Sequence, residues 1–352
     1  MQIFKTIEKH FRENLPFVVY KKPNTNNLLG FFQNDDRLNF VKNFKETGFV
    51  FCNFSGDKNI IFRTENAVVV NEKIDVYDDL KLVKNYNISN KNNKEHHIKL
   101  VKKGIKAIEN NVFDKVVLSR KEEIELVDFD FIQSLKKLLN SNQNSFVYIW
   151  FHPKVGFWMG AFSEQLLKIS NLNFSTMSLA GTQKYESSTK ANWKLKEIQE
   201  QQIVTDFIVE SLKNDIESIE IEKPETIKSG NILHLKSDIF ARLKPSYDLE
   251  QLIKKLHPTP AVCGFPKQNS KAFILDNEKY DREFYAGFLG ELNMASSKNI
   301  KTTDLFVNLR CMKIDQNQVT IYVGGGITKD SVPELEWDET VSKSLTIKSI
   351  LN

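Results

Sequence analysis

The chain has 352 residues, of which 41% are hydrophobic and 27% charged. This usage is that of ordinary soluble globular proteins, and it excludes a disordered, collagenous or disulfide-rich chain. The 49 basic and 45 acidic residues leave a net charge of +4 and are mixed along the chain, without the arginine-rich stripes that grip phosphate backbones. Nucleic acid is therefore not an expected partner.

The cysteines and the amino-terminal residues indicate the expected cellular location of the protein. Cys52, Cys263 and Cys311 stand far apart and form no CxxC pair, so neither a disulfide framework nor a zinc knuckle is predicted. Charged residues interrupt the first 20 positions, which leaves no signal core. The dense apolar stretch 146–151 is far too short to cross the roughly 30 Å of a bilayer's hydrocarbon. We expect a soluble, cytoplasmic protein that does not contact a membrane.

The first predicted elements are two runs of aromatic and β-branched residues. Residues 48–54 and 59–62 are separated by Ser55-Gly56-Asp57, which is typical of a β-hairpin. The polar, asparagine-rich stretch 85–97 then predicts a loop after the amino-terminal portion. We interpret it as a surface connection, so the whole chain, 1–352, is expected to form a single domain.

Strands outnumber helices in the rest of the chain. Apolar residues at helical spacing predict a helix from Ile98 to Ile108, and further helices are predicted at 130–140, 191–214, 248–257 and 334–351. Strands are predicted at 115–124, 145–151, 166–170, 232–235, 284–292, 305–314 and 318–323. Because strands often follow one another directly, the predicted fold class is α+β with large, mostly antiparallel sheets.

Two pairs of glutamates are the first candidates for chemistry. Glu197 and Glu200 lie three residues apart in one predicted helix, and Glu336 and Glu339 repeat that spacing in another, so each pair projects from one helical face. Like charges at this spacing repel, and a shared Mg²⁺ would relieve the repulsion, since it binds carboxylates together with water and an anionic substrate. Spacing alone leaves the alternative open that both pairs are solvated helix faces.

Three further features stand out, and two of them have alternative interpretations. Lys115 opens a predicted strand, where its side chain either snorkels to solvent or faces a closed cavity as a neutral amine that can serve as a base. The proline-rich stretch 257–266 predicts a helix stop followed by a rigid turn. Residues 324–326, three glycines after a strand, predict a turn, although they also let backbone N–H groups approach an anion.

Eight motifs occur in one order along the chain. They are KVVLSR (115–120), LAGT (179–182), KEIQE (196–200), HPTPAVCGFP (257–266), DREFYAGFLG (281–290), LRCMKI (309–314), YVGGGI (322–327) and ELEWDET (334–340). In this order they resemble the motifs of the chorismate-utilising enzymes over about residues 98–350, whereas residues 1–97 match only loosely. The resemblance implies one α+β domain of large, mostly antiparallel sheets packed face to face, with helices outside and a cleft near the sheet layers.

The resemblance is strongest to the isochorismate-forming members of the family. It implies an Mg²⁺-dependent, reversible conversion of chorismate to isochorismate, in which water adds at ring carbon 2 as the carbon 4 hydroxyl departs. The family's base falls on Lys115 and its acid on Glu164, which should be neutral and protonated, respectively, near pH 7. The metal ligands fall on Glu197, Glu200, Glu336 and Glu339. The substrate contacts fall on Thr182, His257, Tyr285, Arg310, Gly324, Gly325, Gly326 and Lys343.

The chain departs from the family pattern at three positions. Phe162-Ser163 precedes Glu164 where Ser-Pro is usual, Gln201 replaces a histidine, and Gly325 replaces a frequent alanine. None of these changes removes a predicted ligand. The turn before Glu164 is nevertheless expected to differ from that of the relatives.

Other residues separate the branches of the family. Ala180 stands where the aminodeoxychorismate branch has a lysine, and the anthranilate branch, which receives ammonia from a glutaminase, generally lacks the base lysine. Water is therefore the expected nucleophile, and no glutamine amidotransferase partner is expected. Salicylate synthases, which also eliminate pyruvate, are the nearest alternative, and Ala261 and Val262 favour the isochorismate-forming type. A chorismate-binding protein without turnover is the other alternative.

Overall fold

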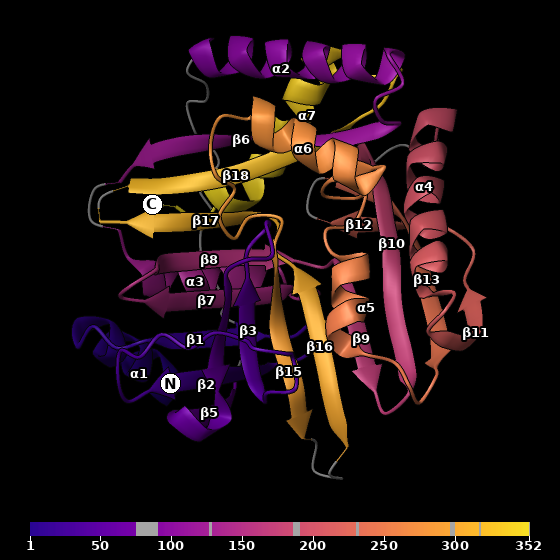
Figure 1. Cartoon of the computed structure of the whole chain (residues 1–352). Helices are drawn as coiled ribbons and strands as arrows, with labels where there is room; N and C mark the ends of the chain where they lie inside the picture. The colour runs from indigo at the N-terminus through magenta and orange to yellow at the C-terminus, as the bar shows by residue number, and fades with distance from the viewer. Residues whose placement is uncertain are drawn as a thin grey trace.

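The computed structural model describes residues 1–74, 91–126, 129–185, 191–229, 232–295, 300–316 and 318–351. Within these ranges the chain forms two large β-sheets and seven α-helices (Figure 1). Every strand pair that the structure describes is antiparallel. The predicted α+β class with large antiparallel sheets is confirmed.

The strands of the first sheet come from the amino-terminal half of the chain and from residues 264–327. In spatial order they are β14 (Gly264–Phe265), β6 (Lys115–Glu125), β18 (Gln318–Ile327), β17 (Cys311–Asp315), β8 (Gly156–Phe162), β7 (Phe146–His152), β1 (Phe17–Lys21), β2 (Asn27–Gln33) and β5 (Ala67–Lys73).

The second sheet is built mainly from the middle of the chain. Its order is β11 (Ile216–Ile221), β13 (Ile232–Leu243), β10 (Asn173–Lys184), β9 (Gln165–Ser170), β16 (Lys301–Val307), β15 (Phe288–Ala295), β3 (Gly48–Cys52) and β4 (Asn59–Arg63), with β12 (Glu225–Ser229) also paired to β13.

The helices lie outside the sheets. They are α1 (Gln2–Arg12), α2 (Lys91–Glu109), α3 (Phe131–Ser141), α4 (Leu195–Leu212), α5 (Leu249–Leu256), α6 (Lys267–Asn277) and α7 (Pro333–Lys348), and a 3₁₀ turn spans Thr64–Asn66. Helix α4 runs beside β10 and β13, and α2 lies over α7 (Figure 1).

Strand β7 shows how the sequence produces these layers. All seven of its residues are buried, and successive side chains of a strand point to opposite faces. Phe146, Tyr148 and Trp150 accordingly join one apolar core, whereas Val147 and Ile149 join a second core with residues of α1 and α3. A strand that is buried on both faces has to be apolar throughout, which explains the uninterrupted hydrophobic run.

Several predicted elements have different boundaries in the structure. The hairpin of β3 and β4 is confirmed. The predicted loop 85–97 is wrong from residue 91 onward, because α2 begins there, and residues 85–90 lie outside the described ranges. In that first stretch of α2, His97 is 1% exposed and its ring lies 5.9 Å from that of Trp337 on α7, so tertiary packing outweighs the loop propensity of the asparagines.

Three strand predictions also change. The single strand expected at 305–314 is two, β16 and β17, because the chain turns at Arg310, whose φ is +43°. The strand expected at 284–292 begins only at Phe288. The glycines 324–326 continue β18 instead of forming a turn.

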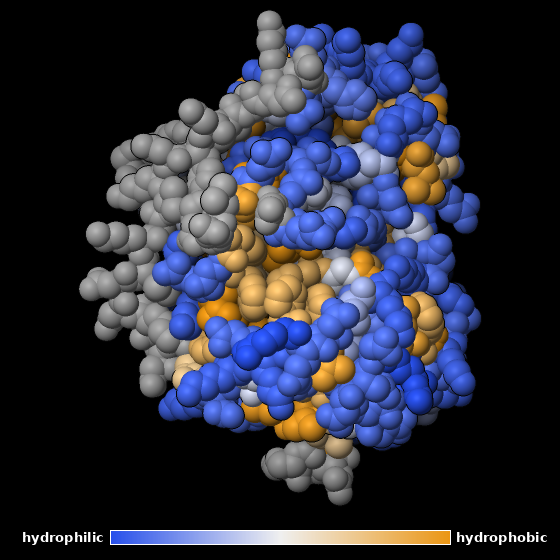
Figure 2. Space-filling view, turned by 90° about the vertical axis from the view of Figure 1, so that its left-hand side faces the viewer, coloured by the Kyte–Doolittle hydropathy of each residue, from blue (hydrophilic) through white to orange (hydrophobic). Residues whose placement is uncertain are grey.

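Other elements were not predicted from the sequence. They include α1, β1 and β2 at the amino terminus and α6 directly after the proline-rich stretch. The three cysteines are buried as free thiols. Among the described helices none is long and apolar enough to cross a membrane. The face in Figure 2 is mainly hydrophilic, and apolar side chains line a hollow near its centre.

Candidate active site

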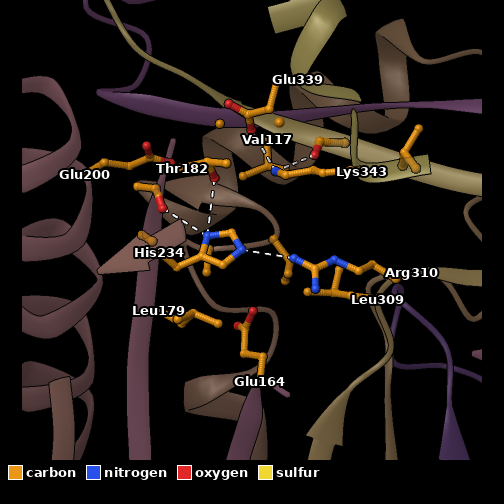
Figure 3. A pocket seen from close by; sticks show the side chains of 18 of the residues that line it. Val117, Glu164, Leu179, Thr182, Glu200, His234, Leu309, Arg310, Glu339 and Lys343 are labelled. Carbon is orange, nitrogen blue, oxygen red and sulfur yellow. Dashed lines mark hydrogen bonds and ion pairs between the residues drawn. The ribbon is translucent and has the colours of Figure 1, made fainter. Parts of the chain in front are cut away.

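A pocket lies where the two sheets approach each other, and both contribute to its walls. Strands β6 and β18 line it from the first sheet, β10 and β13 from the second, and α4 and α7 each add a carboxylate (Figure 3). Seven of the predicted substrate-binding residues line it: Thr182, Tyr285, Arg310, Gly324, Gly325, Gly326 and Lys343. The motifs that are widely separated in the sequence therefore meet at one place.

The glycines of β18 allow side chains to come close to the backbone. A Cβ atom added to Gly326 would overlap the Glu200 carboxylate, and one added to Gly325 would lie 3.4 Å from Glu339 Oε1 and 3.6 Å from Glu336 Oε2. Three of the four predicted metal ligands thus converge over two glycines. The close approach of Glu200 requires glycine at 326, where φ is not positive, whereas the distances at Gly325 are ordinary van der Waals contacts.

The backbone of β18 also has an open edge beside these glycines. Strand β17 pairs with β18 only as far as Tyr322, whereas β6 stays paired to Ile327. The edge of residues 324–326 that faces away from β6 therefore has no partner strand within the described residues. Lys343 uses this edge and donates from Nζ to the Gly324 carbonyl over 3.0 Å.

Each of the three converging carboxylates has a lysine partner. Lys115 Nζ lies 2.8 Å from Glu200 Oε1, and Lys343 Nζ lies 2.7 Å from Glu339 Oε1. The third pair joins two helices, because Lys196 of α4 donates to Glu336 of α7 over 2.7 Å. These pairs place both signs of charge around the glycines.

Burial raises the pKa values of the buried carboxylates, and the neighbouring lysines lower them. Burial by itself raises the pKa of Glu200, but Lys115 and the other nearby lysines outweigh it and bring that pKa below its usual value. Burial raises the pKa of Glu336, and the neighbouring Glu339 raises it further. Two carboxylates three residues apart therefore do repel each other in the folded protein.

Lys115, the predicted base, is fully buried at the start of β6. It does not line the pocket itself but lies behind Gly326, since a Cβ atom added to that glycine would be 3.1 Å from Lys115 Cε. The snorkelling interpretation is therefore wrong. The charged group paired with its ammonium is the carboxylate of Glu200.

Glu164, the predicted acid, follows β8 and enters the pocket from the side opposite Glu200 and Glu339 (Figure 3). It is 6% exposed. Burial raises the pKa of this carboxyl to about 7, although Lys115, Arg310 and Lys343 oppose the rise. A desolvated carboxyl with a pKa near neutrality has the property that a general acid needs.

His234 is a pocket residue that sequence reasoning missed. Arg310 donates from NH2 to His234 Nε2 over 2.9 Å. Since a guanidinium only donates, the ring carries its proton on Nδ1, which lies 3.0 Å from the Gly181 carbonyl and 3.4 Å from Thr182 Oγ1. Burial, Arg310 and Lys343 lower the pKa of His234 to about 3, so the ring is neutral. A lone histidine in an apolar strand was the only available signal.

Four predicted site residues do not line the pocket: Lys115, Glu197, His257 and Glu336. His257 ends α5 and packs against Phe288 with ring centroids 4.9 Å apart, and it does not line the pocket. Its predicted contact with the substrate has no support from this position. Glu197 caps its own helix, because its Oε2 accepts a hydrogen bond from the Lys194 backbone N–H over 3.0 Å.

Two buried arginines hold the walls of the pocket in place. Arg282 pairs with Glu278 over 2.5 Å and donates to the carbonyls of Val117 and Val262, two residues that line the pocket. Arg120 of β6 donates from Nε to Thr340 Oγ1 of α7 over 2.8 Å. The charge-assisted, multiple bonds of an arginine are well suited to such positioning.

The donor chemistry of the site suits a hard divalent cation. Glu200, Glu336 and Glu339 offer carboxylate oxygens that converge over the glycines, and Mg²⁺ prefers such oxygens. Among the described residues, however, no group of three or more His, Cys, Asp or Glu side chains is already arranged to hold a metal ion. The carboxylates are drawn toward their lysines instead.

Comparison with known proteins agrees with this architecture. A family model described as chorismate binding enzyme matches residues 50–352. The isochorismate synthase MenF of Pasteurella multocida (strain Pm70) is 28% identical over 280 residues, which are 75% of this chain and 63% of that protein. The chain spans about three fifths of the length of the curated relatives it matches, since the MenF proteins of Escherichia coli and Haemophilus influenzae are each covered to 59%.

Solved structures share the fold. The DhbC protein of Bacillus anthracis superposes with a TM-score of 0.80 at 22% identity, over 99% of both chains. The menaquinone-specific isochorismate synthase MenF of Escherichia coli superposes with a TM-score of 0.77 at 20% identity, over 96% of this chain and 89% of that one. With the match of the family model to most of its length, the chain belongs to the chorismate binding enzymes.

Proposed function

We propose that the protein is an isochorismate synthase, which converts chorismate reversibly to isochorismate with the help of Mg²⁺. The observation that carries the proposal is the placement of two buried groups about one pocket. Glu164 lies on one side with a raised pKa, and Lys115 lies behind the opposite wall beside Glu200. The relatives named above, which are isochorismate synthases, support the same assignment.

Lys115 is the base in this proposal. For this role the ammonium that is paired with Glu200 first has to lose a proton, and the neutral Nζ then takes a proton from a water molecule whose oxygen forms a bond to ring carbon 2. The ring double bonds shift, and the bond from carbon 4 to its hydroxyl oxygen breaks. Because the side chain is fully buried, bulk water has little access to the site and does not compete with the amine as the acceptor of that proton.

Glu164 is the acid. It gives its proton to the departing hydroxyl oxygen, which leaves as water, so the atoms of the substrate and product balance. A pKa of about 7 keeps a large fraction of this carboxyl protonated at neutral pH, whereas an ordinary glutamate would be almost entirely ionised. General acid catalysis of this kind contributes about 10²–10⁴ in rate.

The carboxylates of chorismate need cationic partners. We propose that Arg310, Lys343 and the open backbone edge of residues 324–326 bind them, with Arg310 oriented by neutral His234. Glu200, Glu336 and Glu339 would hold Mg²⁺, with Glu197 as a further predicted ligand. When bound, the ion would supply positive charge for the carboxylate on the substrate ring.

The direct test incubates the purified protein with chorismate and Mg²⁺ and separates the products by chromatography. Isochorismate as the product that accumulates is the expected result. Salicylate with an equal amount of pyruvate would instead assign the salicylate synthase activity. Unchanged chorismate, under conditions in which the protein binds it, would mean a binding protein without turnover and would refute the proposal.

A further inference from the structure

The three ion pairs around the glycines of β18 are not equivalent. Lys115 and Lys343 already have roles in the proposed reaction, as base and as substrate contact. Lys196 has neither role, and it does not line the pocket. It nevertheless crosses from α4 to α7 to reach Glu336, whose side chain is only 3% exposed.

We propose that Lys196 is a built-in counter-ion of Glu336 that competes with the divalent cation and so sets the affinity of the site for it. This inference rests on the proposed function, since it needs a cation at these carboxylates. It goes further by naming a residue that acts against binding. The sequence analysis assigned no role to Lys196, although this residue opens the KEIQE motif.

The competition follows from the geometry. The Lys196 ammonium donates to Glu336 Oε1 over 2.7 Å and thereby occupies one of the oxygens that a cation would need. The other oxygen, Oε2, is the one that faces Gly325. A cation held there has to share the carboxylate with the ammonium or displace it, and in both cases the two positive charges repel.

The same contact would also stabilise Glu336 whenever no cation is bound. Glu336 is buried close to Glu339 on the same helix, so an unpaired charge there would be costly. The lysine side chain is 25% exposed and can move toward solvent once a cation takes its place. The pair therefore acts as a reversible substitute for the ion.

The test measures Mg²⁺ binding by calorimetry on the full chain without substrate. Lys196→Met removes the positive charge and keeps the length of the side chain, so it should bind Mg²⁺ about tenfold more tightly than the unmodified protein. Lys196→Arg keeps the charge and should restore the original affinity. Lys213→Met is the matched control, since Lys213 lies just beyond α4 and pairs with the exposed Glu210, which is no predicted ligand.

Thermal unfolding supplies a second measurement that does not depend on turnover. Without Mg²⁺, Lys196→Met should unfold at a lower temperature than the unmodified protein, and saturating Mg²⁺ should raise its Tm by more. If Lys196→Met does not fold, Lys196→Gln serves in the same two measurements.

The outcomes separate this inference from the proposed function. Mg²⁺ binding by the unmodified protein with equal or weaker binding by Lys196→Met would overturn the role of Lys196 and leave the proposed function standing. Mg²⁺ binding by Lys196→Met but not by the unmodified protein would support the inference, because the positive charge of Lys196 would then be what prevents binding. Absence of binding in all variants would overturn the inference together with the metal site, while product analysis with chorismate would still test the reaction.

Discussion

Glu164→Gln replaces the proposed acid by an amide of the same size that cannot ionise. In the folded protein the pKa of this carboxyl is about 7, compared with an ordinary value of 4.5. Since one pKa unit corresponds to about 1.4 kcal/mol, the buried carboxylate costs the folded state about 3 kcal/mol once it is ionised. The substitution should therefore abolish most of the activity and still stabilise the protein at alkaline pH.

The sign follows from the two pKa values. Below pH 4.5 the carboxyl is protonated in the folded and the unfolded chain, and it then contributes no penalty. Between pH 4.5 and 7 the unfolded chain loses its proton first, so the stability of the unmodified protein declines and reaches its lower level above pH 7. The stability of Glu164→Gln does not decline over this pH range for this reason, because the amide does not ionise.

Unfolding curves at pH 4.5, 6, 7 and 8 measure the difference. The variant should match the unmodified protein at pH 4.5 and exceed it by about 3 kcal/mol at pH 8, a Tm difference on the order of 5 °C. Its turnover should be lower by about 10²–10⁴. Glu220→Gln, at an exposed position of β11, is the control and should show neither effect. A variant as active as the unmodified protein, or a stability difference that does not change with pH, would refute the reasoning.

Four further results are expected. Turnover of the unmodified protein should fall as the pH rises through 7, because Glu164 loses the proton that it donates; a flat profile from pH 6 to 8 would contradict the acid. Lys115→Gln should lower isochorismate formation by about 10² or more with an unchanged circular dichroism spectrum, and near-normal turnover would exclude the base. Gly326→Ala should push the Glu200 carboxylate away and destabilise the protein by about 1–3 kcal/mol, measured in urea. Chelation by EDTA should stop the reaction, and added Mg²⁺ should restore it.

Arg120 of β6 contributes to the position of α7. Arg120 is 6% exposed, donates from Nε to Thr340 Oγ1 over 2.8 Å, and lies 4.4 Å from the ring centre of Trp337. Trp337 and Thr340 each follow one of the α7 glutamates directly. These contacts explain why both carboxylates face β18, and they come from a strand more than 200 residues away in the sequence.

Much of the fold was accessible from local patterns. Apolar runs and period-two alternation placed β6, β7 and β9 to within about a residue or two, because a strand needs apolar side chains on each face that it buries. The order of the motifs pointed to the family. The spacing of Glu336 and Glu339 placed both on one face of what is α7, since a helix returns to the same face after three or four residues.

Other features were decided only when distant segments packed together. His234 enters the pocket because β13 pairs with β10, which sets Thr182 opposite it, whereas His257, in a more conspicuous motif, packs against Phe288. Likewise, the identity of Lys115 says nothing about its neighbours, and it is the approach of α4 that gives it Glu200. Local periodicity depends on the geometry of residues that are adjacent in the chain, so it can be predicted from the sequence. The partner of a buried charge depends on which remote element packs beside it, so only the tertiary structure decides it.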